Sequence, residues 1–158
     1  EPMAAKPNPL EAGQPAPLFT ATTHAGEVVD LAALRGRKVV VYFYPKDNTP
    51  GCTAQACNLR DNLGLLEEHG IVVIGISPDD DDSHERFTQR YDLTFPLVAD
   101  PDREIIERYG VWGERKNYGK TFMGLQRTTF LIDEDGVIQH VFKRPKTKAH
   151  AEEIIGKL

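Results

Sequence analysis

Val39-Val-Val-Tyr-Phe-Tyr44, followed by Pro45-Lys-Asp-Asn-Thr-Pro-Gly-Cys52, is the stretch that decides the fold. Its first six residues are apolar or aromatic throughout, which is typical of a strand buried on both faces of a sheet. Thr49 suits the cap of a helix, and Pro50 suits its first position because proline lacks the N–H that would be unpaired there. A central strand that turns directly into a helix is therefore predicted, with Cys52 in the first helical turn.

The same alternation of apolar runs and amphipathic segments continues beyond Cys52. A helical pattern over 53–68 leads to a second apolar run over 71–76, then to a helix over 83–91 and a strand over 95–100. Strands that alternate with helices in this way are typical of parallel sheets whose two faces are covered by helices.

The last third of the chain changes pattern. A helix is expected over 102–109, and the polar, Gly-containing stretch 113–126 is interpreted as a loop. Strand-like runs over 128–132 and 137–142 flank an Asp-Gly turn, which predicts an antiparallel hairpin. A C-terminal helix is expected over 149–158. The whole pattern predicts an α/β fold, a central mixed β-sheet flanked by helices on both faces.

A proline-rich arm precedes the folded region. Five prolines lie in residues 1–17, so this arm is expected to be extended and held only near Leu18 and Phe19. Residues 18–158 are then expected to form one domain, because a chain of 158 residues can bury a sufficient core without disulfides or metals.

Charge and hydropathy argue against two classes of partner, nucleic acids and membranes. The net charge is −5 and there is no long block of Lys and Arg, which argues against a nucleic-acid partner. The longest apolar runs are six residues, whereas a membrane span needs about 20, so no membrane partner is expected. The first residues lack a basic segment followed by an apolar one, and the two cysteines are closely spaced, so a cytoplasmic location is expected.

Cys52 and Cys57 carry the strongest chemical signal. In a first helical turn, unpaired N–H groups and the positive end of the helix dipole favour the thiolate, the nucleophilic form of cysteine. On one regular helix the Cα atoms of Cys52 and Cys57 would be about 8.7 Å apart, farther than the about 7 Å that a disulfide tolerates. A bond between them therefore requires the first turns of the helix to unwind. The alternative is that both are inert, buried cysteines.

The motif Pro45-x-x-x-Thr49-x-x-Cys52 resembles the active-site motif of the peroxiredoxins. With Cys57 five residues later, it is similar to the bacterioferritin comigratory protein / peroxiredoxin Q branch. Further similar stretches take the resemblance from about residue 18 to 158: GISPD (75–79), FPLVADPD (95–102), YGVWGE (109–114) and YGKTFMGLQRTTFLIDEDG (118–136). It implies a thioredoxin-like fold and a thiol-dependent peroxidase that reduces hydrogen peroxide and alkyl hydroperoxides without metal, haem or flavin.

The resemblance also implies a role for each matching residue. Cys52 stands where the peroxidatic cysteine becomes a sulfenic acid, and Cys57 where the resolving cysteine closes an intramolecular disulfide. Thr49 and Arg127 stand where a hydroxyl and a guanidinium bind the thiolate and the peroxide. Pro45 stands where a ring shields the pocket from water. Thioredoxin or glutaredoxin is the implied reductant. Because the bridge needs no second subunit, a monomer is expected, with a weak dimer as the alternative.

Two features near the motif admit more than one interpretation. Gln55 stands where many members of the branch have an acidic residue, so one negative charge near the thiolate is missing. The consequence is either a slightly more acidic Cys52 or a different local network of contacts. Trp112, Tyr118, Phe122 and Met123 precede Arg127 and are expected to pack against the sheet. The alternatives for these four are an apolar collar over the peroxide pocket or a self-association surface.

Other functions remain open from the residues alone. Cys52 with the distant His140 could form a Cys–His hydrolase pair, and a redox sensor or a general disulfide exchanger would also use a reactive cysteine. A metal site is not expected, because the five histidines lack metal-ligand spacing. The run Asp79–Asp82 lacks the pattern of a calcium loop and is interpreted as a solvated loop, with Asp82 and Glu85 capping the next helix.

Overall fold

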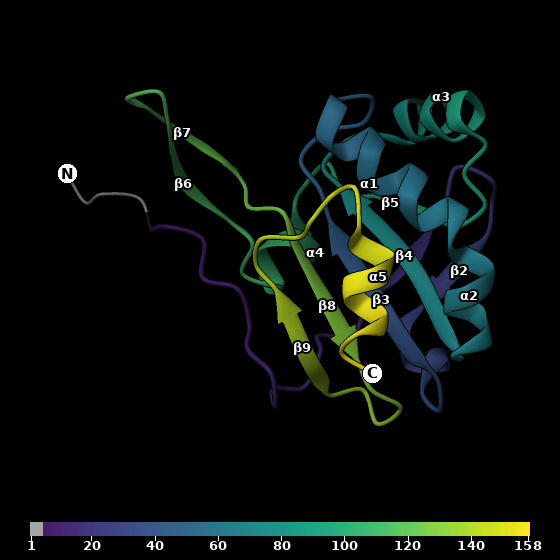
Figure 1. Ribbon diagram of the computed structural model, residues 1–158. Helices are drawn as coiled ribbons and strands as arrows, with labels where there is room; N and C mark the ends of the chain where they lie inside the picture. Colours follow the sequence, from purple (N-terminus) through teal and green to yellow (C-terminus); the bar gives the residue numbers. More distant parts are fainter. Residues whose placement is uncertain (1–4) are drawn as a thin grey trace.

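The computed structural model describes residues 5–158 (Figure 1). Its centre is a five-stranded mixed sheet in the order β5-β4-β3-β8-β9. The first three strands of that order are parallel to one another, and β8 and β9 run antiparallel to their neighbours. The predicted mixed sheet is confirmed, with the strands β3 (Lys38–Phe43), β4 (Ile71–Ser77), β5 (Leu97–Ala99), β8 (Thr128–Ile132) and β9 (Ile138–Phe142).

Alternate residues of β3 enter two separate cores, because successive side chains of a strand point to opposite faces of the sheet. Val40 and Tyr42 point into the core on the face of the sheet that four helices cover. Val41 points into the core on the opposite face. The first core is covered by α1 (Pro50–Asp61), α2 (Leu63–Glu68), α3 (Asp81–Tyr91) and α5 (His150–Ile155). The second is covered by α4 (Glu104–Arg108), the 3₁₀ helix η1 (Leu31–Leu34) and the small sheet of β1 (Thr20–Thr22) and β2 (Val28–Asp30).

Each expected helix has different bounds in the structure, and the cause is visible for two of them. The single helix expected over 53–68 starts at Pro50 and is interrupted at Asn62, whose amide donates to the carbonyl of Asn58 at 2.8 Å. Such side-chain bonds to the backbone compete with helix continuation. The helix expected from residue 83 starts at Asp81, because the cap is Asp80, whose carboxylate accepts from the N–H of Ser83.

The loop expected over 113–126 is a β-hairpin, so that prediction was wrong. β6 (Trp112–Asn117) pairs with β7 (Lys120–Leu125) across a two-residue turn. Tyr118 and Gly119 both have positive φ, 51° and 76°, which is the conformation of the type I′ turns that suit a twisted hairpin. The pair lies outside the main sheet, so its strands do not show the apolar alternation that identifies a strand packed on a core.

The expected packing of the hairpin's apolar residues against the sheet is also wrong for three of them. Tyr118 is 96% exposed, Phe122 48% and Met123 49%. Trp112 is half-buried, and the guanidinium of Arg103 lies 4.4 Å from the centre of its ring.

From residue 5 to residue 17 the proline-rich arm contains no helix, turns at Glu11–Gln14, and is held along more of its length than predicted. Asn8 donates its N–H to the carbonyl of Gly110, and Gly13 donates to that of Ile138. At Gly110 an added Cβ would lie 2.2 Å from the Asn8 carbonyl oxygen, so a glycine permits this approach. The first four residues of the arm lie outside the described residues.

From residue 5 onward, every helix is too short or too polar to cross a lipid bilayer.

Candidate active site

Cys52 lies in the first turn of α1, next to the end of β3. Thr49 occupies the cap position with extended backbone (φ −84°, ψ 154°), and Pro50 begins the helix, as the sequence predicts. The Cys52 side chain is 1% exposed, whereas that of Cys57 is half-buried, and both are free thiols. A single α-helix contains both cysteines. They therefore have the separation that excludes a disulfide unless the helix opens.

Arg127 makes the decisive contact with Cys52. Its Nη2 donates to the Cys52 sulfur at 3.2 Å, and its Nη1 donates to the Gln55 side-chain oxygen at 2.6 Å. A guanidinium is permanently charged, so it stabilises a thiolate without giving up its own proton. At Gly51, an added Cβ would lie 3.1 Å from Nη2, so this glycine leaves room for the guanidinium.

The sheet explains how Arg127 reaches a residue 75 positions earlier. β8 runs antiparallel to β3, and Phe43 at the end of β3 is paired with Thr128 at the start of β8. The residue before β8 and the helix after β3 therefore meet at the same edge of the sheet. Neither position by itself predicts this contact.

Gln55 has a role that the sequence analysis missed. The sequence indicates only a lost charge or a different local network, whereas the Gln55 side chain is fully buried and accepts a hydrogen bond from the second terminal nitrogen of Arg127. Its position three residues after Cys52 could have indicated this role, because residues three apart lie on the same face of a helix. Within residues 5–158 its Nε2 has no hydrogen-bond partner.

Thr49 and Pro45 lie in the turn that leads from β3 to α1. The Thr49 hydroxyl donates to the carbonyl of Lys46 at 2.7 Å and makes no hydrogen bond to Cys52 in the described structure. Its oxygen keeps lone pairs that can accept a hydrogen bond. Pro45 is exposed. Their roles toward a peroxide stay predictions.

A buried polar cluster holds this turn against α3, and sequence reasoning did not find it. The Asp47 carboxylate accepts from the Tyr44 hydroxyl at 2.6 Å and contacts the His84 Nδ1 at 2.7 Å. The His84 Nε2 faces the carbonyl of Val98 at 3.1 Å. Both ring nitrogens of His84 therefore face oxygen atoms of the surrounding protein. This buried pair ties the turn before Cys52 to α3.

Asp79 completes the cluster from the end of β4. Its carboxylate accepts from the N–H of Asp47 at 2.8 Å and from the hydroxyl of Ser77 at 2.7 Å. One potential ligand atom from each of Asp47, Asp79 and His84 lies within 4.8 Å of the others. The protein's own donors and acceptors engage these atoms. The strand order could have predicted this cluster, because polar residues that follow adjacent parallel strands meet at the same edge of the sheet.

Two stacked tyrosines lie in the core that also contains Cys52. Tyr42 stacks on Tyr44 with ring centres 5.3 Å apart, and both are buried in the same core as Cys52. Burial raises the pKa of the Tyr42 phenol well above its ordinary value, and the negative charge of Cys52 adds to this effect. The phenol therefore stays protonated and does not compete with Cys52 as a nucleophile.

The family model described as AhpC/TSA family matches residues 12–141. This chain belongs to the AhpC/TSA family. It is 48% identical over 149 residues to the putative peroxiredoxin bcp of Coxiella burnetii, covering 94% of this chain and 99% of that one. It is 47% identical to the peroxiredoxin Bcp of Escherichia coli K12, covering 94% and 95%.

Structural comparison places the AhpC/TSA fold of this chain close to a solved peroxiredoxin. The bacterioferritin comigratory protein of Xanthomonas campestris superposes with a TM-score of 0.83 at 30% identity, covering 92% of this chain and 96% of that one. The resemblance to the bacterioferritin comigratory protein / peroxiredoxin Q branch and the thioredoxin-like fold are both confirmed.

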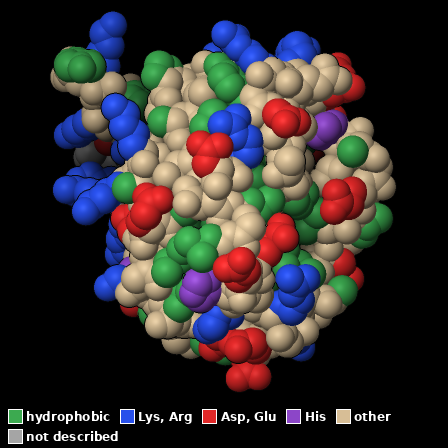
Figure 2. All heavy atoms as spheres, turned by 45° about the vertical axis from the view of Figure 1, so that its right-hand side comes forward, with side chains coloured by type: hydrophobic (Ala, Val, Ile, Leu, Met, Phe, Trp, Pro, Cys, Tyr) green, Lys and Arg blue, Asp and Glu red, His purple; other side chains and the backbone are tan. Residues whose placement is uncertain are grey.

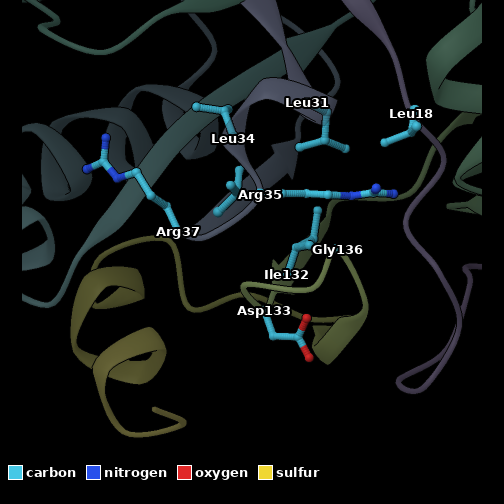
Figure 3. Close-up of a pocket in the computed structure, with 9 residues that line it drawn as sticks. Leu18, Leu31, Leu34, Arg35, Arg37, Ile132, Asp133 and Gly136 are labelled. Atoms are coloured by element: carbon cyan, nitrogen blue, oxygen red, sulfur yellow. The ribbon is translucent and has the colours of Figure 1, made fainter.

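The Cys–His hydrolase alternative finds no support at Cys52. His140 lies on β9 with its ring 4.5 Å from that of Phe142, and no hydrogen bond joins it to Cys52 among residues 5–158. A hollow near Leu31 and Arg35 is only about 10 Å³ in volume (Figure 3). It lies where β3 begins and β8 ends, at the opposite end of these strands from Cys52. The candidate active site is therefore the cysteine site itself.

Proposed function

We propose that this protein is a thiol-dependent peroxidase in which Cys52 is the nucleophile. The observation that carries the proposal is the hydrogen bond from the Arg127 guanidinium to the Cys52 sulfur, at the N-terminus of a helix. Both features favour a thiolate. The Xanthomonas campestris relative has been studied for alkyl peroxide reduction, which supports hydroperoxides as the substrate class.

In the first step the Cys52 thiolate attacks one oxygen of the peroxide bond. The O–O bond breaks, the sulfur is oxidised to a sulfenic acid, and the departing oxygen takes a proton to become water or an alcohol. The Arg127 N–H groups stabilise the charge that develops on the departing oxygen. Thr49 offers its hydroxyl to the peroxide, and Pro45 limits the access of water.

In the second step the Cys57 thiol attacks the sulfur of the sulfenic acid. A disulfide forms, and the sulfenic oxygen leaves as water. A dithiol reductant of the thioredoxin or glutaredoxin type then restores both thiols by exchange. The cycle requires no metal, haem or flavin. The cytoplasm expected from the sequence is a reducing compartment that supplies such dithiols.

The burial of Cys52 argues against general disulfide exchange as the main activity. At 1% exposure, its sulfur is not accessible to the folded surface of a protein disulfide. Rapid turnover linked to a reductant would also exclude a role limited to redox sensing.

The proposal is tested by intact mass and peptide mapping after one equivalent of hydrogen peroxide. The reduced protein is expected to lose the mass of two hydrogen atoms within seconds, with the bridge mapped to Cys52 and Cys57. Cys57→Ser should stop at a Cys52 sulfenic acid, and Cys52→Ser should not react. Retained turnover in Cys52→Ser would refute the assignment.

A further inference from the structure

The β6–β7 hairpin projects from the end of the main sheet that carries Cys52 (Figure 1). Its strands pair only with each other in the described part of the chain, apart from one bond from the N–H of Glu114 to the carbonyl of Ala5. A two-stranded hairpin is marginally stable by itself in water. A projecting hairpin with this exposure therefore suggests that its surface has a use.

The hairpin combines exposed apolar side chains with positive charge. It carries three of the seven large apolar residues that are exposed on residues 5–158, namely Tyr118, Phe122 and Met123. Three cations, Arg115, Lys116 and Lys120, lie on the hairpin against the single carboxylate of Glu114, although the whole chain has a net charge of −5. Figure 2 shows Lys and Arg side chains gathered on the projecting part of the surface.

The base of the hairpin is next to the reacting sulfur. β7 ends at Leu125, two residues before Arg127, which binds Cys52. A groove of about 260 Å³ follows β6 beside this base and is lined by Lys6, Pro7, Glu114, Arg115, Lys116 and Gln126. A protein that reaches the cysteine site from this side therefore contacts the hairpin.

We propose that the β6–β7 hairpin is the docking surface for the protein dithiol that reduces the Cys52–Cys57 disulfide. This inference rests on the proposed function. The partner it fits has an apolar surface around its reactive cysteine and carboxylates at the border, complementary to the exposed Tyr118 and Phe122 and to the cations beside them. Exposed apolar patches and complementary charges are the features that mark such interfaces and accelerate encounter.

The reductant opens the Cys52–Cys57 bridge by two successive thiol–disulfide exchanges. A thiolate of the reductant attacks one sulfur of the bridge, and the other sulfur leaves as a thiolate. The second thiolate of the reductant then attacks the mixed disulfide and releases the remaining cysteine. Two electrons pass to this protein, and the reductant becomes a disulfide.

Two hairpin variants separate the apolar and the charge contributions. The apolar variant is Tyr118→Asn with Phe122→Thr and Met123→Thr, in which asparagine tolerates the left-handed backbone at 118 and threonine suits a strand. The charge variant is Lys116→Gln with Lys120→Gln. The matched controls change exposed residues elsewhere, Val28→Thr with Leu65→Gln for the first and Lys143→Gln with Arg144→Gln for the second.

Three reactions are followed by quenched-flow mass spectrometry: oxidation by hydrogen peroxide, reduction of the bridge by dithiothreitol, and reduction by bacterial thioredoxin or glutaredoxin. Both hairpin variants should match the wild type in the first two reactions. Their kcat/KM with the protein reductant should fall at least tenfold, and the charge variant should lose the salt dependence of this reaction. The controls should behave as the wild type.

Three results would overturn the docking proposal. The first is an unchanged kcat/KM with both protein reductants in both hairpin variants. The second is a wild-type bridge that dithiothreitol reduces but neither protein does. The third is a wild-type dimer in sedimentation that the hairpin variants dissociate while their reduction is unchanged, which would assign the hairpin to a second copy of the chain. Failure to form a bridge with peroxide would instead refute the proposed function.

Discussion

Arg127 connects two buried side chains of α1 through one planar group. Its two terminal nitrogens donate to Cys52 and to Gln55, 3.2 Å and 2.6 Å away. The orientation of the guanidinium thus depends on an amide that performs no chemistry. A lysine at this position would keep the charge but could not reproduce the two fixed N–H directions.

We expect Arg127→Ala to slow the reaction of Cys52 with hydrogen peroxide about 100-fold, the effect typical of removing a donor that stabilises developing negative charge. Arg127→Lys should recover only part of this loss. The measurement is the second-order rate constant of sulfenic acid formation in the Cys57→Ser background.

Gln55→Ala serves as the positioning control for this prediction. It leaves Arg127 in place but removes the second acceptor, so the rate should fall less than in Arg127→Ala. Gln55→Glu should restore the acceptor. Equal rates in Arg127→Ala and its parent would contradict the role of Arg127.

At the scale of single elements, α1 is a regular helix that must change during the cycle. Cys52 and Cys57 lie within its 12 residues, about 8.7 Å apart by helix geometry. We expect amide hydrogens in the first turns of α1 to exchange much faster in the disulfide form than in the dithiol form. Hydrogen exchange with mass spectrometry on both forms tests this, and α3 provides the internal reference. Equal protection of α1 in the two forms would exclude the unwinding.

His150 joins α5 to the main sheet and makes this contact pH-sensitive. Its Nδ1 lies 2.6 Å from the Glu153 carboxylate, and its Nε2 lies 2.8 Å from the Thr129 hydroxyl. A neutral imidazole satisfies both partners, with Nδ1 donating and Nε2 accepting. Burial lowers the pKa of His150 below its ordinary 6.5, although the charge of Glu153 opposes the shift and that of Arg127 adds to it.

A lowered histidine pKa means that the unfolded chain binds more protons than the folded protein in this range. The contribution of His150 to the free energy of unfolding is therefore complete above pH 6.5 and is lost as the pH falls through the folded-state pKa. Urea unfolding from pH 5 to 8 should show this slope in the wild type and less of it in His150→Gln. The exposed His69→Gln is the control, and identical slopes in all three proteins would contradict the assignment.

At the scale of the whole molecule, the N-terminal arm joins the segment after α4 to the start of β9. The N–H groups of Asn8, Leu10 and Gly13 donate to carbonyls of Gly110, Tyr109 and Ile138. Leu10 also packs against the core. A chain that starts at Gln14 should lose about 3 kcal/mol of unfolding free energy, at about 1 kcal/mol for each hydrogen bond. Urea unfolding measures it, and a chain that starts at Pro7, which keeps all three bonds, is the control. Equal stability of the two chains would show that the arm contributes nothing.

Local sequence determined the parts of this protein that depend on neighbours along the chain. The apolar run 39–44, Thr49 at the cap position and the Pro50 start were sufficient to place a central strand and to put Cys52 in a first helical turn. The apolar runs around the Asp-Gly turn likewise predicted the β8–β9 hairpin. Such features follow from backbone periodicity and from unpaired N–H groups, which act within a few residues.

Only the tertiary structure decided the contacts between distant segments. The antiparallel pairing of β3 with β8 brings Arg127 to Cys52 and Gln55, and the parallel pairing of β3 with β4 brings Asp47 to Asp79. The β6–β7 hairpin was missed because no core imposes an apolar alternation on it. Local sequence patterns indicate which segments are buried and where helices end. Which side chains meet at one edge of the sheet depends on which strands become neighbours, and no local pattern indicates this.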